Sequence, residues 1–436
     1  MLAAMIRAWL DSISVYLERR VLSLLFFGFS SGLPLLLVYS TLSAWLTEVG
    51  VSKTAIGFVS LVGTAYALKF LWSPLVDAVR LPVLAGLLGH RRSWLLLSQL
   101  ALVGSLLSLS VMDPALEMTA FALVAVVVAF SSATQDIVID AYRIESADQK
   151  LQGVMAASYQ YGYRIAVIVG TAGALFVADA VSWPVAYMTM AGCMGIGFLT
   201  TLLCSEPVSH RPIGSSLHGS LAQRVSQWIY IAVVEPFVDF VRRYKGWSFV
   251  FLAFIASFYI SDRVLGILAM PFYEDIGFTK TQVGAIAKIY GTWVSIVGAA
   301  AGAVAVVRYG IARCIVAASL LIVSTNLFFA LITVSGPKLE LLTLTISFDN
   351  FALGFGSTVM IAYLSSLVNV NYTATQYALL SSVSTFFGKL LAGFSGDVQM
   401  VVGWLNFFFY AAGTGIPAIV LSVLVARRML AEDRDG

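Results

Sequence analysis

The chain has 436 residues, of which 59% are hydrophobic and only 11% are charged, and its mean hydropathy is +0.90. This composition excludes an ordinary soluble domain, in which roughly a quarter of the residues are charged, and indicates an integral membrane protein. The net charge of +3 says little about partners, because the distribution of Lys and Arg carries that information in a membrane protein.

Apolar segments of about 20 residues, the length that a spanning helix needs, recur along the whole chain. Helix is expected in each, because only helices and closed barrels satisfy the backbone in lipid, and these runs lack the alternation of barrel strands. The sequence predicts an all-α integral membrane fold with twelve transmembrane helices, near residues 22–46, 54–76, 94–112, 116–140, 155–178, 183–203, 247–271, 282–306, 314–333, 340–366, 376–397 and 400–425.

The basic residues predict the direction of these helices. If the N-terminus lies in the cytoplasm, only Lys53, Lys280 and Lys338 fall in outer loops, and the remaining loop Lys and Arg residues are inside. This imbalance predicts a multi-pass protein with both termini cytoplasmic. Residues 1–20 read as an amphipathic stretch without a small-residue cleavage site, so a cleaved signal peptide is not expected.

The longest loop divides the chain into an N-terminal half, residues 1–203, a cytoplasmic linker, residues 204–246, and a C-terminal half, residues 247–436. Apolar linker residues at helical spacing predict an amphipathic helix on the inner membrane surface, either as a tether between moving halves or as a passive lipid anchor. These residues are Leu221, Val225, Trp228, Ile229, Val233, Phe237 and Phe240.

An internal repeat supports this division. TEVGVSKTAIG, residues 47–57, matches EDIGFTKTQVG, residues 274–284, at an offset of 227, and both stretches join the first and second helix of their half. Two six-helix halves in the same orientation resemble the major facilitator superfamily, whose halves rock about a site at the membrane midplane.

Charged residues inside the predicted spans are candidates for function, because charge in a membrane is costly and usually faces a bundle interior or a wet cavity. The deep ones are Lys69, Asp136, Arg164, Asp262, Arg263, Lys288, Asp349 and Lys389. Counted along the helices, they predict one mixed-sign cluster in the inner part of the N-terminal half and another in the outer part of the C-terminal half.

The stretch FSSATQDIVIDAYRIE places Ser132, Asp136, Asp140 and Arg143 on one helical face. Asp140 and Arg143 predict a surface ion pair. Asp136 lies deeper, and two hypotheses fit it. It could form a salt bridge to Lys69 or Arg164, or it could carry a proton by moving between environments of different proton affinity. Because no predicted span contains a histidine, carboxylates are the expected coupling groups, with Asp262 and Asp349 as further candidates.

A second constellation lies in the fifth predicted helix, where Tyr159 and Tyr163 share one face and Gln160 and Arg164 share another. Arg164 could grip a ligand carboxylate, and the tyrosines could hold sugars or amides. The alternative is an Arg164–Asp136 bridge with the tyrosines as ordinary packing.

The segments GFSSGLPLLLVYSTLSAWL, IGFVSLVGTAYALKFLWSPLVD, GHRRSWLLLSQ and ATQDIVIDAYR resemble the AmpG family of bacterial inner-membrane muropeptide permeases. The resemblance implies proton-dependent import of anhydromuropeptides for cell-wall recycling and β-lactamase induction. It also implies roles for Gln135 and Asp136, which match the family's Gln-Asp pair, and for Lys69. With these, the predicted substrate-binding residues are Gln135, Tyr159, Gln160, Tyr163, Arg164, Lys69, Lys288 and Lys389.

Other functions remain open at this point. The same fold could import a siderophore or an acyl-CoA compound, or could serve as a signalling scaffold without flux, which the retained buried charges disfavour. No nucleophile–base grouping, metal motif or phosphate loop indicates an enzyme, and neither the cysteines nor the histidines have metal-ligand spacing. We expect no cofactor, no metal and no nucleic acid partner, and a monomer that binds its substrate and protons within the lipid bilayer.

Overall fold

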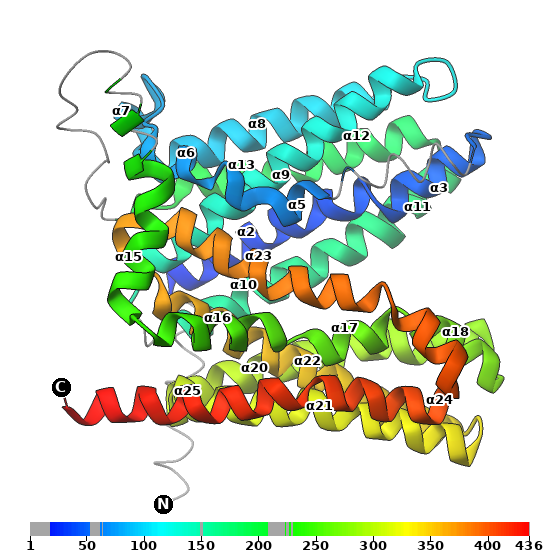
Figure 1. Ribbon diagram of the computed structural model, residues 1–436. Helices are drawn as coiled ribbons and strands as arrows, with labels where there is room; N and C mark the ends of the chain where they lie inside the picture. Colours follow the sequence, from blue (N-terminus) through cyan, green and yellow to red (C-terminus); the bar gives the residue numbers. More distant parts are fainter. Residues whose placement is uncertain are drawn as a thin grey trace, which may run out of the picture. The chain divides into compact units, whose positions relative to one another are not determined.

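The computed structural model describes residues 18–52, 62, 64–148, 151–207, 223, 226–227 and 230–435 (Figure 1). Every regular element in this part of the chain is a helix, and ten helices are long and apolar enough to cross a membrane. The predicted all-α membrane fold is therefore confirmed.

The ten membrane-length helices correspond to all of the predicted spans except the second and the eleventh. Much of the second lies outside the described residues, and its remainder forms short helical pieces. The eleventh corresponds to α23, Thr373–Ala392, a helix of 20 residues. The number of twelve spans is thus consistent with the structure.

The chain forms two compact units. Unit 1 comprises residues 1–148, 158–238 and 368–379, and unit 2 comprises residues 149–157, 239–367 and 380–436. Short segments near residues 150 and 370 therefore belong to the unit opposite the one that their sequence position suggests. The contiguous division at residues 203 and 247 stays a prediction.

Unit 1 begins with a long first helix that is interrupted after Leu37. Its elements are α2 (Arg19–Leu37), α3 (Ser40–Glu48), α5 (Thr64–Leu68), the 3₁₀ turn η3 (Lys69–Leu71), α6 (Ser73–Ala78), α7 (Leu84–Leu88), α8 (His90–Val111), α9 (Met118–Ser146), most of α10 (Gln152–Ile168), the π-helix η5 (Val169–Gly173), α11 (Ala174–Ala180), α12 (Trp183–Cys193), α13 (Gly195–Leu203), the π-helix η6 (Tyr230–Val234), the 3₁₀ turn η8 (Val370–Tyr372) and the start of α23.

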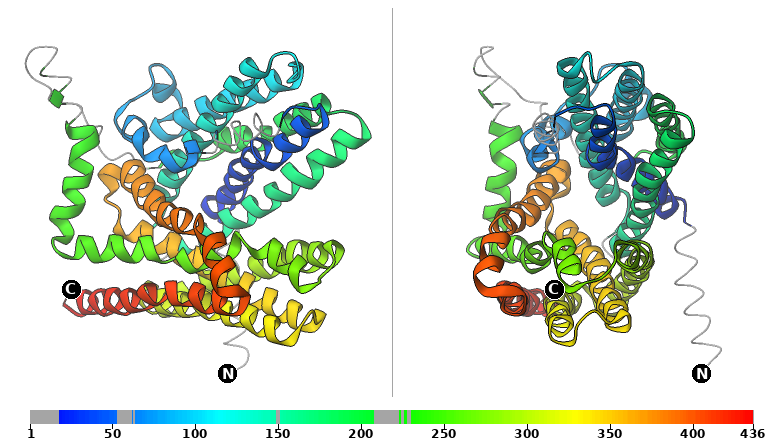
Figure 2. Two further views of the ribbon diagram at one scale, coloured as in Figure 1. Left: turned by 45° about the vertical axis from the view of Figure 1, so that its right-hand side comes forward. Right: turned by 90° about the vertical axis from the view of Figure 1, so that its right-hand side faces the viewer.

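Unit 2 also has an interrupted first helix, which consists of α16 (Trp247–Ser257), α17 (Ile260–Gly266) and α18 (Ala269–Ile276). Its other elements are most of α15 (Glu235–Tyr244), α19 (Lys280–Val283), the π-helix η7 (Gly284–Tyr290), α20 (Gly291–Tyr309), α21 (Ile311–Ser335), α22 (Leu339–Leu367), the rest of α23, α24 (Ser395–Thr414) and α25 (Ile416–Asp435). Within this unit α20, α21 and α22 lie side by side (Figure 2).

Glycines allow two pairs of helices to approach closely. A Cβ atom built on Gly162 of α10 would lie 1.8 Å from the backbone oxygen of Leu25 in α2. In unit 2, a Cβ on Gly298 of α20 would lie 2.3 Å from the backbone oxygen of Phe351 in α22. Only a residue without a side chain fits such crossings.

The repeated sequence forms the same turn in both units. Gly50 and Gly277 end α3 and α18 with φ angles of 80° and 103°. Each glycine N–H donates to the carbonyl three residues back at 3.1 Å, and the next N–H donates to the carbonyl five residues back at 2.9 Å. This is the Schellman pattern, which glycine adopts without steric cost. The later identities of the repeat lie largely outside the described residues.

An aromatic cluster forms the core beside each of these turns. In unit 1 the Trp45 ring packs 4.9 Å from Tyr187 and 5.2 Å from Phe121, measured between ring centroids. In unit 2 the Phe272 ring packs 4.7 Å from Phe408. Trp45 and Phe272 are separated by the same offset of 227 as the repeat. The internal symmetry of the sequence thus extends from the turn into the packing.

Within the described part of the linker, η6 and α15 form helix over residues 230–244. Phe240 is buried while the neighbouring Val241 and Arg242 are exposed, as expected for an amphipathic helix. The predicted apolar positions Leu221, Val225, Trp228 and Ile229 lie outside the described residues.

Candidate functional site

Pro34 creates a local polar contact in the first helix. Proline has no N–H, so the carbonyl of Ser30, four residues earlier, loses its usual helical partner. The Gln135 side chain of α9 donates to that carbonyl at 3.0 Å and accepts from the Ser30 hydroxyl at 2.9 Å. Gln135 is fully buried in this clamp. Its predicted part in substrate binding is therefore untested, whereas its structural part between α2 and α9 is evident.

Ser31 of α2 and Asp136 of α9, which directly follow Ser30 and Gln135, form a second set of polar contacts. The Ser31 hydroxyl donates to the Asp136 carboxylate at 2.5 Å and lies 2.7 Å from the Tyr159 hydroxyl. Three helices, α2, α9 and α10, thereby meet at one serine. The hydrogen-bond partner of Asp136 in these contacts is the Ser31 hydroxyl, while Lys69 interacts with this carboxylate electrostatically.

The cation predicted beside Asp136 pairs instead with its neighbour one helical turn later. Lys69 Nζ lies 3.6 Å from Asp140, and Arg143 lies 3.5 Å from the same carboxylate. The Asp140–Arg143 pair predicted from the spacing is therefore present, but the prediction that it lies at the surface is wrong, because the Arg143 side chain is only 1% exposed. The Arg143 guanidinium also lies over the Tyr377 ring, 5.1 Å from its centroid. We call Ser31, Lys69, Asp136, Asp140, Arg143 and Tyr159 the unit 1 polar cluster.

The α10 constellation lies beside this cluster. The rings of Tyr159 and Tyr163 are 6.1 Å apart between centroids, which confirms that they share a face. Arg164 lies close enough to Tyr163 for an electrostatic interaction, and Gln160 is partly buried. The close approach of α2, which the glycines allow, brings the tyrosines toward Ser31.

Unit 2 holds the second group of charges. Arg263 lies 4.0 Å from Asp262 and over the ring of Tyr259. Asp349 of α22 interacts electrostatically with Asp262, and Lys389 of α23 interacts with Arg263. We call Asp262, Arg263, Asp349 and Lys389 the unit 2 polar cluster. Mixed-sign clusters therefore form in both units, while their depth in the membrane stays a prediction.

Lys288 lies on the π-helix η7 and its side chain is exposed. A π-turn within a helix often marks a functional position, because it shifts side chains out of the regular register. A role of Lys288 in binding substrate stays a prediction.

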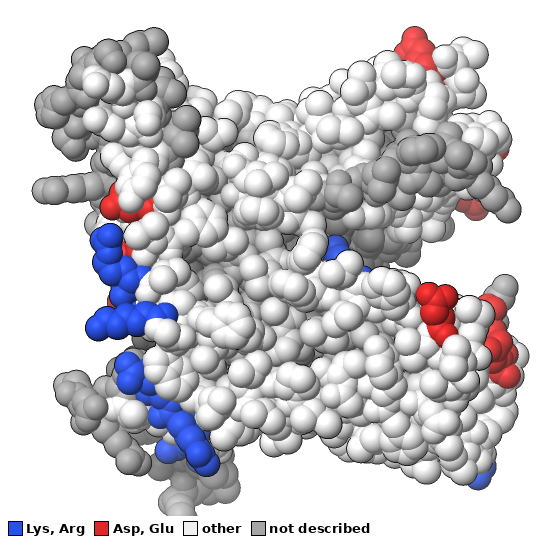
Figure 3. Space-filling model, viewed as in Figure 1, with Lys and Arg blue, Asp and Glu red and all other residues white. Residues whose placement is uncertain are grey.

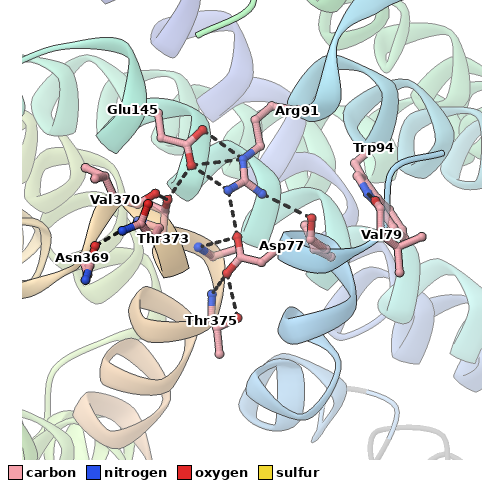
Figure 4. A network of polar contacts seen from close by, with 12 residues as sticks. Asp77, Val79, Arg91, Trp94, Glu145, Asn369, Val370, Thr373 and Thr375 are labelled. Carbon is pink, nitrogen blue, oxygen red and sulfur yellow. Dashed lines mark hydrogen bonds and ion pairs between the residues drawn. The ribbon is translucent and has the colours of Figure 1, made fainter. Parts of the chain in front are cut away.

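A buried network that the sequence did not reveal joins α6, α8, α9 and α23 within unit 1 (Figure 4). The Arg91 guanidinium lies 2.8 Å from Asp77 and 2.6 Å from Glu145. Asp77 in turn accepts hydrogen bonds from the Thr375 N–H at 2.8 Å and from its hydroxyl at 2.7 Å, and Thr373 donates to Glu145.

This network has two physical functions at once. Arg91 neutralises two carboxylates that would otherwise be buried with unpaired charge. Asp77 also caps the N-terminal turn of α23, whose first N–H groups have no partner inside the helix. The sequence signals were Asp77 at the end of SPLVD and the arginine pair after Gly89, but their distance in sequence concealed the contact.

Glu206 caps another helix. Its carboxylate accepts hydrogen bonds from the backbone N–H groups of Arg91 and Arg92 at 2.6 and 3.0 Å, at the start of α8. The Arg92 side chain donates to the carbonyl of Thr201 at 2.8 Å, near the end of α13. Burial raises the pKa of the Glu206 carboxyl above its ordinary value, against the lowering effect of these hydrogen bonds.

The described groups are suited to transfer of protons and binding of polar solutes within membrane helices. A carboxylate whose hydrogen-bond partner is a serine hydroxyl can exchange a proton without breaking an ion pair. Cations, amides and tyrosines can bind carboxylates, sugars and peptide groups. Within the described residues no group of three or more His, Cys, Asp or Glu side chains could hold a metal ion.

Comparison with known sequences finds one family model and several relatives that are named as transporters or permeases. The family model described as Major Facilitator Superfamily matches residues 21–393. The putative transporter AmpG 4 of Rickettsia felis is 31% identical over 419 residues, which cover 95% of this chain and 98% of the relative. The anhydromuropeptide permease of Escherichia coli K12 is 33% identical over 419 residues, which cover 95% of this chain and 81% of the relative.

Solved structures show the same fold at lower identity. The human organic anion transporter MFSD10 matches with a TM-score of 0.65 and 16% identity, over 93% of this chain and 99% of that one. A proton:xylose symporter matches with a TM-score of 0.62 and 14% identity, over 96% of this chain and 95% of that one. At such identities the likeness concerns the fold alone.

Proposed function

Because the chain belongs to the AmpG family of the major facilitator superfamily, we propose that it imports anhydromuropeptides into the cytoplasm together with protons. The observation that carries the proposal is the 33% identity to an anhydromuropeptide permease over 95% of this chain. The substrates are GlcNAc-1,6-anhydro-MurNAc with or without peptide, released when the cell wall is turned over. Their import would serve recycling of peptidoglycan and, through it, β-lactamase induction.

The unit 1 polar cluster supports the coupling to protons. Asp136 accepts from a hydroxyl, while Lys69 and Arg143 are already held by Asp140. Binding or release of a proton at Asp136 therefore leaves this ion pair intact. The Ser31 and Tyr159 hydroxyls offer a short hydrogen-bonded route to the carboxylate.

Each cluster, taken by itself, offers groups that are complementary to the substrate. A peptide-bearing muropeptide carries carboxylates, which arginine and lysine bind by charge-assisted hydrogen bonds. Arg263 and Lys389 of unit 2 keep exposed side chains. The sugar rings and amides suit the tyrosine pair of α10, because tyrosine combines a flat apolar face with a hydroxyl.

Uptake by purified protein in liposomes tests this function. We expect radiolabelled GlcNAc-anhydro-MurNAc-tripeptide to accumulate above its outer concentration when a proton gradient is directed inward, and empty liposomes to stay at background. Counterflow without a gradient tests the substrate separately from the coupling. If folded protein shows neither accumulation nor counterflow, the muropeptide assignment fails, and siderophores and acyl-CoA compounds become the solutes to screen in the same vesicles.

A further inference from the structure

A cavity of about 360 Å³ opens on unit 1 between the first turns of α2 and the last turns of α13, with Tyr142 of α9 in its wall. It is separate from the residues of the unit 1 polar cluster. Its size lies near the lower end of the range for ligand sites, which suits part of a ligand and not a whole large one.

One side of the cavity is apolar and exposed. Leu22 and Phe26 of α2 are 38% and 40% exposed, and Leu199 and Leu203 of α13 are 58% and 72% exposed. Both helices belong to segments that are long and apolar enough to cross a membrane. Such side chains face acyl chains and not water. We call these four residues the α2/α13 groove.

The other side of the cavity is basic. Arg19 and Arg20 are the first residues of α2, and both are exposed. Arg20 donates to the carbonyl of Ser146 at 3.0 Å. Among the residues that the structure describes, no ion pair joins either arginine to a carboxylate. The nearby acid Glu18 is exposed at the N-cap and makes no capping hydrogen bond with its side chain.

We propose that this cavity binds an anionic glycerophospholipid, with the phosphate at Arg19 and Arg20 and the upper part of one acyl chain in the α2/α13 groove. A basic surface and an apolar surface meet in this cavity, at the end of a helix of membrane length. Basic residues at this position attract anionic head groups, and a soluble anion would leave the apolar wall without a ligand. The arginine guanidinium suits a phosphate because it can donate two parallel hydrogen bonds.

Native mass spectrometry of the full chain with added phosphatidylglycerol or phosphatidylcholine tests this proposal. We expect the wild type to retain phosphatidylglycerol in preference to phosphatidylcholine. The double variant Arg19→Gln/Arg20→Gln should bind phosphatidylglycerol roughly tenfold more weakly or worse. The matched control is Arg427→Gln/Arg428→Gln, which changes an exposed arginine pair on α25 outside the cavity and should leave the affinity unchanged.

A second variant tests the apolar part. Leu199→Trp should fill the groove and weaken retention of phosphatidylglycerol while both arginines remain. Equal losses in the two arginine variants would overturn the proposal, because the effect would then be one of net charge. Displacement of the lipid by millimolar glycerol 3-phosphate would also overturn it and assign the cavity to a soluble phosphate. Each variant's unfolding temperature in detergent shows that it is folded.

Discussion

At the scale of single residues, Asp136 differs from the other acidic groups of its helix. Asp140 one turn later is held by two cations, whereas the described contact of Asp136 is to a serine hydroxyl. The spacing in the sequence placed both on one face but could not decide which of them Lys69 would reach. Lys69 begins the short 3₁₀ turn η3, an interruption of the helix that the sequence pattern did not predict.

Replacement of this carboxylate tests the coupling directly. Asp136→Asn keeps the size of the side chain and can still accept from Ser31, so folding should be retained, but the amide cannot carry a proton between environments. We expect gradient-driven accumulation to fall to background while counterflow persists. Asp113→Asn, in the exposed loop before α9, is the matched control and should transport as the wild type does. Full accumulation by Asp136→Asn would remove this residue from the coupling role.

Gly162 is the residue at which the close crossing of α2 and α10 is most sensitive. A methyl group there would lie 1.8 Å from the backbone oxygen of Leu25, so one helix must shift. Gly162→Ala should lower the free energy of unfolding by about 1–3 kcal/mol, the usual cost of overpacking. Gly104→Ala on α8, where no atom lies within 4 Å of the added carbon, should be neutral or slightly stabilising. Thermal unfolding in detergent measures both, and equal behaviour would refute the packing argument.

At the scale of elements, the first turn of α23 depends on a distant side chain. Asp77 of α6 accepts from the N–H groups of Ala374 and Thr375, so it caps this helix from another element. Asp77→Asn removes the charge and one acceptor. We expect amide hydrogen exchange of residues 374 and 375 to become roughly tenfold faster, as for loss of a charge-assisted hydrogen bond. Asp113→Asn again serves as control, and unchanged exchange in the Asp77 variant would contradict the capping role.

The cap of α8 should respond to pH. Burial raises the pKa of Glu206, so the folded protein favours its protonated form more than the unfolded chain does. The stabilisation associated with this group is therefore fully present below its ordinary pKa and is lost as the pH rises through the folded value. Relative to Glu206→Gln, the wild type should lose stability from about pH 4 toward neutral pH. Parallel curves of stability against pH for the wild type and Glu206→Gln would disprove this pH dependence.

Element positions were largely predictable because apolar runs of membrane length are a strong signal, and the repeated glycine turn was visible as sequence identity. Interruptions within the helices were not predictable from the sequence. α2 stops at Leu37 and α16 at Ser257 without a polar loop in the sequence. The buried Asp77–Arg91–Glu145 network was also not predicted. Its partners come from different helices, and hydropathy contains no information about side-chain pairing.

At the scale of the whole molecule, the distribution of basic residues predicts how the protein is inserted. In unit 2, Lys and Arg gather over α15 and the C-terminal end of α25, while Asp and Glu gather over α18 (Figure 3). This asymmetry supports the proposed orientation, with the basic ends in the cytoplasm. Reporter enzymes fused after α25 should be active only if they function in the cytoplasm. Activity of a periplasmic reporter at that position would reverse the proposed orientation.

The glycine crossings also restrict how each unit can deform. The backbones of α10 and α2 are in close contact at Gly162, and those of α20 and α22 at Gly298. If one helix of a pair moved along the other by a turn, a side chain would take the place of the glycine and would clash. We therefore expect the two helices of each pair to move together as a rigid body. Flexing is left to the points where the first helix of each unit is interrupted, beside Tyr39 and Tyr259, so these short breaks would serve as the joints of the transport cycle.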